Sequence, residues 1–150
     1  MTSFKLNVSR AARVIGLALL VGSSASAAHA STAALKATQD MFVHSYDGMG
    51  CEDVTSKPNM GRMMSGSCIE FQIKIKNNDY STTAKAINFK NPVDKGLVFI
   101  TAVTEGFAGG TLDIPAMNTD CSKQLCLVKI QDGSIKPKQT GILKIRAIVK

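Results

Sequence analysis

Tryptophan is absent from the 150-residue sequence, and aromatic residues make up only 5% of it. Proteins that bind nucleic acid combine a basic face or stripe with aromatic side chains on which bases stack. The formal charge is +7, but the lysines are spread along the chain and form no such cluster. The sequence therefore predicts no nucleic-acid partner.

Histidine is almost as scarce, and only one of the two, His44, follows the first thirty residues. The sequence contains no G-x-S-x-G segment, which would present a nucleophilic serine, and no D-x-D-x-D-G calcium loop. Asp113, Asp120 and Asp132 lie near expected turns, where aspartate is common for structural reasons. We expect no catalytic residue and no cofactor, and predict that the protein is not an enzyme.

Long hydrophobic runs are lacking too. Residues 14–21 (VIGLALLV) are apolar, but a membrane-spanning helix needs about 20 such residues. Three basic residues precede this run: Lys5, Arg10 and Arg13. An A-x-A segment ends at Ala30, so the pattern predicts a signal peptide over residues 1–30, cleaved before Ser31. Cleavage takes the formal charge from +7 to +4 and leaves one exported domain, residues 31–150, in the periplasm, on the cell surface or secreted.

Four cysteines remain after this cleavage: Cys51, Cys68, Cys121 and Cys126. An even number in an exported chain indicates two disulfides. Three pairings are open, and we favour the sequence-local ones, Cys51 with Cys68 and Cys121 with Cys126. A zinc-type site is disfavoured because neither pair has C-x-x-C spacing.

Strict alternation marks the central strand. Ile69, Phe71, Ile73 and Ile75 alternate with Glu70, Gln72, Lys74 and Lys76. A period of two indicates a strand with one buried face and one solvent face.

Further strands are expected at residues 35–44, 82–91, 97–104, 125–131 and 141–150, and residues 111–117 are expected to hold a short edge strand that Pro115 interrupts. A helix over residues 33–41 is an alternative for the first. Asp132-Gly133 is a strong turn signal, and residues 47–67 have the composition of a long loop. About seven short strands without a convincing helix predict an all-β, immunoglobulin-like antiparallel β-sandwich.

The order of these motifs resembles a conserved-repeat domain of bacterial and archaeal surface proteins, catalogued as domain of unknown function number eleven. Asn77 matches the asparagine that ends a strand in that family. Residues 91–97 (NPVDKGL) resemble its D-P-L-P-x-G-L segment, and Pro137 precedes the last strand as in the family. The resemblance implies an immunoglobulin-like fold in an exported, often cell-surface protein, and no catalysis.

Two functional classes follow. The first is a binding or adhesion module of the cell envelope, which contacts a protein or envelope partner through loops or a sheet face. The second is a pilus or fibre subunit that self-associates by donating its N-terminal strand, residues 31–44, to a neighbour. A minor alternative is periplasmic copper binding, since thioether and imidazole ligands suit copper. Its ligands would surround the long loop: His44, Met49, Met60, Met63 and Met64.

Overall fold

The computed structural model describes residues 34–43, 51 and 64–150. This part of the chain contains eight strands and no helix. The strands are β1 (Leu35–Val43), β2 (Cys68–Asn77), β3 (Ala84–Pro92), β4 (Leu97–Glu105), β5 (Thr111–Asp113), β6 (Thr119–Asp120), β7 (Leu127–Ile135) and β8 (Thr140–Val149). The all-β prediction is therefore confirmed, and the helical alternative for the first segment is wrong.

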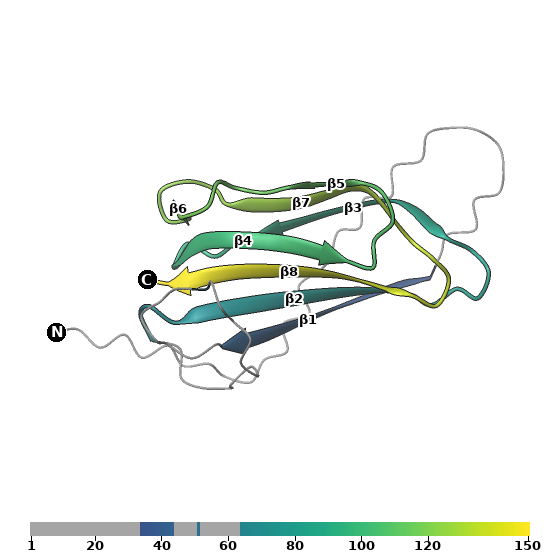
Figure 1. Cartoon of the computed structure of the whole chain (residues 1–150), viewed down its shortest axis with the longest axis horizontal. Coiled ribbons are helices and arrows are strands. Elements are labelled where there is room, and N and C mark those ends of the chain that lie inside the picture. The colour runs from purple at the N-terminus through teal and green to yellow at the C-terminus, as the bar shows by residue number, and fades with distance from the viewer. Residues whose placement is uncertain (1–33, 44–50, 52–63) are drawn as a thin grey trace.

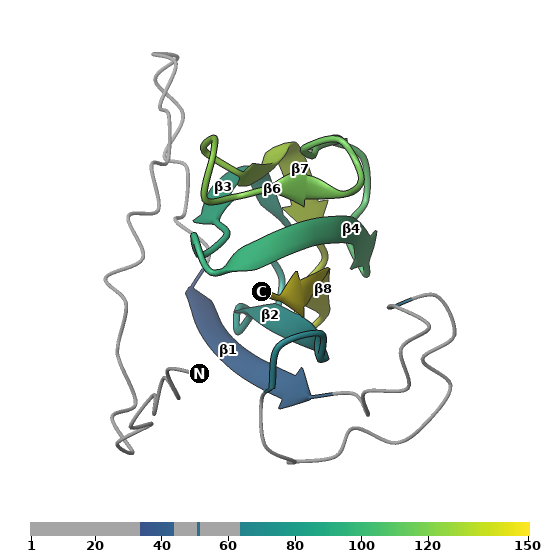
Figure 2. The same cartoon turned by 90° about the vertical axis from the view of Figure 1, so that its left-hand side faces the viewer.

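The strands form two antiparallel sheets that face each other as a β-sandwich (Figure 1). The five-stranded sheet has the order β1-β2-β8-β4-β6, and the three-stranded sheet has the order β3-β7-β5. β1 and β6 are thus the opposite edges of the larger sheet, as the end-on view in Figure 2 shows.

The core lies between the sheets and draws side chains from both. The alternating residues of β2 and β8 supply one half, with Ile73, Leu143 and Ile145 almost fully buried. Ile87 and Phe89 of β3 face them from the smaller sheet. Alternation in the sequence matches the burial of these side chains because each strand has one face against the core and the other face outward.

The Asp132-Gly133 pair does not form the predicted turn; it lies inside β7. Asp132 adopts a left-handed backbone conformation, with φ of 56°, and the β3–β7 register shifts at this point. An Asp-Gly pair favours positive φ, which suits a bulge as well as a hairpin. The chain instead turns between β7 and β8, where Lys138 has φ of 61°.

Glu70 is the second departure from the expected pattern. The alternation placed it on the solvent face, but the residue is only 4% exposed. Its carboxylate pairs with Arg146, whose guanidinium group also lies 3.5 Å from the carbonyl oxygen of Cys51, the residue joined to Cys68. A polar residue on the outer face is therefore buried beside a disulfide.

Asn77 holds the end of β2 to two other segments. Its buried side chain donates hydrogen bonds to the carbonyl oxygens of Thr82 and Ile135, at 2.8 and 3.0 Å, and accepts one from the amide of Asp79. Asp79 in turn accepts bonds from the amides of Ser81 and Thr82, at 2.8 Å each. Amide chemistry is needed at position 77, because one side chain both donates and accepts.

No helix in the described ranges is long and apolar enough to cross a membrane.

Candidate functional site

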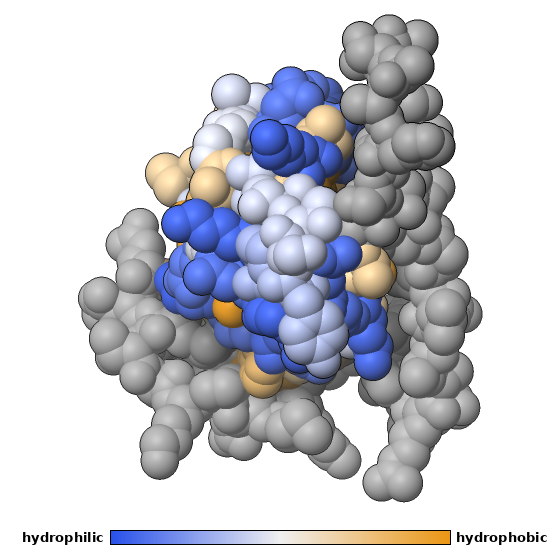
Figure 3. All heavy atoms as spheres, turned by 90° about the vertical axis from the view of Figure 1, so that its right-hand side faces the viewer, coloured by the Kyte–Doolittle hydropathy of each residue, from blue (hydrophilic) through white to orange (hydrophobic). Residues whose placement is uncertain are grey.

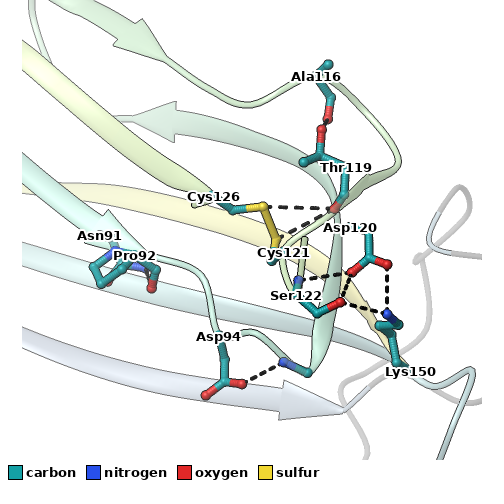
Figure 4. The surroundings of a disulfide bond; sticks show 11 residues. Asn91, Pro92, Asp94, Ala116, Thr119, Asp120, Cys121, Ser122, Cys126 and Lys150 are labelled. Atoms are coloured by element: carbon teal, nitrogen blue, oxygen red, sulfur yellow. Dashed lines mark hydrogen bonds and ion pairs between the residues drawn. A yellow bond between two sulfur atoms is a disulfide. The ribbon is translucent and has the colours of Figure 1, made fainter. Parts of the chain in front are cut away.

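Two loops meet at one end of the sandwich, where β5 ends and β7 begins. The first, residues 114–118, leads into β6; the second, residues 121–126, leads into β7 and is closed by the Cys121–Cys126 disulfide. Thr119 joins them, since its carbonyl oxygen lies 3.6 Å from the sulfur of Cys121 and 3.9 Å from that of Cys126 (Figure 4). The Thr119 amide and hydroxyl also donate to the carbonyl oxygen of Ala116.

These loops carry large apolar side chains that face solvent. Ile114, Met117 and Leu125 are 41%, 64% and 75% exposed, respectively. We call them the apolar loop residues. Binding residues are concentrated on loops that a rigid scaffold positions. The opposite end of the sandwich presents mostly hydrophilic residues in the part of the chain that the structure describes (Figure 3).

A charged contact fixes the second loop to the last strand. The carboxylate of Asp120 accepts hydrogen bonds from the Lys150 ammonium group (2.7 Å), the Ser122 hydroxyl (2.7 Å) and the Ser122 amide (2.9 Å), as Figure 4 shows. These bonds favour the ionised form, and the one from Lys150 contributes most; they hold the pKa of Asp120 well below its usual value. The loop is therefore held by a disulfide on one side and by an ion pair on the other.

The depressed pKa of Asp120 predicts a dependence of stability on pH. A carboxyl group with a lowered pKa in the folded state stabilises the fold above its unfolded pKa, near 3.8, and this contribution is lost as pH falls below that value. Substitution Asp120→Asn should therefore lower the melting temperature at pH 7, and the variant should lose less melting temperature than the wild type between pH 5 and pH 2. Thermal unfolding followed by circular dichroism at several pH values measures this. Equal acid sensitivity of the two proteins would contradict it.

The second disulfide, Cys51–Cys68, builds a small cluster on the outer face of the five-stranded sheet. Ile100 is buried beside it, and Val98 and Ile148 pack against the same group. Both disulfides follow the sequence-local pairing favoured above. The disulfide thus gives Ile148 an apolar neighbourhood on the outer face.

Of the residues of the copper hypothesis, only Met64 lies among the described residues, where it is 55% exposed. The other four candidates, His44, Met49, Met60 and Met63, lie outside the described residues, as do the signal peptide and its cleavage site at Ala30 and Ser31. Copper binding and export stay predictions.

A pocket beside β5 offers little room for a ligand. It has a volume of about 30 Å³. A small-molecule site usually has at least roughly 300 Å³. Its lining residues are Thr104, Phe107, Gly109, Gly110, Thr111, Leu112 and Ile130.

The exposure of the apolar loop residues does not follow from the sequence pattern. The short edge strand expected within residues 111–117 ends before Pro115, which lacks the amide donor that strand pairing requires, and β5 ends at Asp113. The strand expected at residues 125–131 begins only at Leu127, so Leu125 lies in the loop before it. An apolar residue next to such a break has no partner strand and can face solvent.

Comparisons of the chain with protein-family models, with curated proteins and with solved structures find no significant match.

Proposed function

We propose that this protein is an exported, non-enzymatic binding module of the cell envelope, with an immunoglobulin-like fold, which contacts a protein partner through the apolar loop residues. The observation that carries the proposal is the exposure of Leu125 on the loop closed by the Cys121–Cys126 disulfide, and of Ile114 and Met117 on the adjoining loop. A fixed backbone loses little conformational entropy on binding, so exposed apolar area contributes more of its burial energy to affinity.

Export is supported by two kinds of observation. The sequence of residues 1–30 has the features of a cleaved signal peptide. Two disulfides are formed and the described residues include no free cysteine, which is compatible with an oxidising compartment. The resemblance to surface-protein repeat domains points to the same location.

The fibre-subunit alternative would require β1 to leave its own sheet. β1 pairs with β2 over nine consecutive residues, from Leu35 opposite Asn77 to Val43 opposite Ile69. Val43 is also buried in the core. Donation of this strand to a neighbour would break all these contacts first, so we favour the loop-mediated module.

Site-specific photo-crosslinking in cells that express the protein tests the proposal. A photoreactive amino acid at position 117 or 125 should give a protein adduct of defined mass, and a combined Ile114→Ser and Leu125→Ser change should remove the adduct formed from position 117. Position 85 is the matched control, because Lys85 is exposed on β3, an edge strand of the three-stranded sheet. Adducts of the same kind and yield from position 85 would contradict a loop-mediated contact.

A further inference from the structure

The outer edge of β1 differs from the other sheet edges. Within the described residues, β1 pairs only with β2, over nine residues and without a bulge. Edge strands are usually protected by bulges, proline or short length. β3 has a bulge and ends at Pro92, while β5 and β6 are three and two residues long. The sequence of β1, LKATQDMFV, contains no proline or glycine.

The hydrogen bonds beside β1 establish which of its residues offer backbone groups to a neighbour. The carbonyl oxygen of Ala34 accepts a bond from the amide of Asn78, at 2.9 Å, in continuation of the β1–β2 register. Antiparallel strands alternate between residues bonded to the partner and residues that point away. The even-numbered residues of β1 therefore bond to β2. Its odd-numbered residues present their amide and carbonyl groups to the open edge.

We infer that β1 is a self-association edge, where two copies of this chain pair antiparallel about a twofold axis through Thr38. In this register Lys36 of each copy lies opposite Asp40 of the other copy, and Thr38 lies opposite its own equivalent. Opposite charges and threonine pairs directly across two strands are favourable. The odd-numbered residues form the hydrogen-bonded pairs, as the direction of their backbone groups requires.

The charges of β1 select this register over its neighbours. With Gln39 on the axis, Lys36 would face Phe42, and Asp40 would face Thr38. With Asp40 on the axis, two carboxylates would face each other, which is unfavourable. Asp40 uses one carboxylate oxygen, Oδ2, for its 2.9 Å ion pair with Lys74, so Oδ1 can accept a second cation.

The inner face of β1 also favours a partner. β1 lies at the edge of the five-stranded sheet, and the opposing sheet has only three strands. Met41 points to the same side as buried Ile69 and Ile73 but remains 38% exposed. In the twofold pair Met41 lies opposite Leu35 of the second copy, so two partly exposed apolar side chains become neighbours. The loops that carry the apolar loop residues flank β6. They lie away from the paired β1 strands, because β6 is the edge strand opposite β1.

Cysteine cross-linking tests both the pairing and its register. Residues on the axis at a non-hydrogen-bonded position have Cα atoms about 4.5 Å apart, within the range of a disulfide. Thr38→Cys should therefore form a covalent dimer under mild oxidation, located by peptide mass spectrometry. Asp40→Cys and the edge control Lys85→Cys should each give a covalent-dimer yield at least tenfold lower. A preference for position 40, or equal yields at all three, would overturn the register.

A second pair of variants tests the association without added thiols. Gln39→Pro removes an amide that points to the open edge and leaves the β2 ladder intact, so it should shift the mature protein from dimer to monomer in light scattering after size-exclusion chromatography. Lys36→Glu should weaken the dimer by placing like charges opposite each other. A wild-type protein that stays monomeric at millimolar concentration would overturn the inference. The loop variants should leave the dimer unchanged, so failure of the proposed function and failure of this inference are distinguishable.

Discussion

Asn77→Asp is expected to destabilise the domain by roughly 3 kcal/mol or more, although the two side chains have nearly the same size. The amide group of Asn77 donates to two carbonyl oxygens, those of Thr82 and Ile135, from a fully buried position. A carboxylate cannot donate, and it would place a buried negative charge against both oxygens. Urea denaturation followed by circular dichroism measures the change in unfolding free energy.

Asn118→Asp is the matched control for this experiment. Asn118 is exposed and has φ of 63°, a conformation that aspartate also tolerates. The control should alter the free energy of unfolding by no more than about 0.5 kcal/mol. Equal stability of the two variants would mean that the hydrogen bonds of Asn77 do not hold the turn after β2.

Arg146→Met should reduce the free energy of unfolding by about 3 kcal/mol, since it removes a charged partner from a buried carboxylate. The guanidinium Nε of Arg146 donates to Oε2 of Glu70 at 2.8 Å, and the Glu70 side chain is 5% exposed. Gln72 donates to the other oxygen at 2.7 Å, which compensates for only part of the buried charge. Chemical denaturation at pH 7 provides the measurement.

Two further variants separate burial from charge pairing. Lys144→Met removes the partner of Glu105, whose side chain is 54% exposed, so this loss should stay below about 1 kcal/mol. Glu70→Gln combined with Arg146→Met removes the buried charge and should recover much of the stability lost in Arg146→Met alone. If Arg146→Met and Lys144→Met were equally mild, the pair beneath Cys51 would not act as a buried one.

The strands with one buried face could be predicted from the sequence because local alternation reports the burial of each face directly. β2 and β8 illustrate this, as does the inward direction of Ile87 and Phe89 in β3. Very short strands cannot be predicted in this way. β6 has two residues, Thr119 and Asp120, and no alternation can appear over such a length.

The environment of Glu70 could not be predicted from the alternation of its strand, because it depends on residues outside that strand. Cys51 reaches the outer sheet face only through its bond to Cys68, and its carbonyl oxygen lies 3.5 Å from Arg146. Likewise, Asp132-Gly133 has the same local preference in a turn and in a bulge, and the pairing with β3 decides between them. The apolar loop residues were missed for a related reason, since exposure depends on which strands find partners.

The direction of the first and last strands has a mechanical consequence. β1 and β8 both run antiparallel to β2, so they point the same way, and the beginning of β1 lies at the opposite end of the domain from the end of β8 (Figure 1). Tension applied to those two points pulls along the strands, and it loads the hydrogen bonds of each ladder together rather than one after another. A domain connected in this way transmits a pulling force through whole ladders.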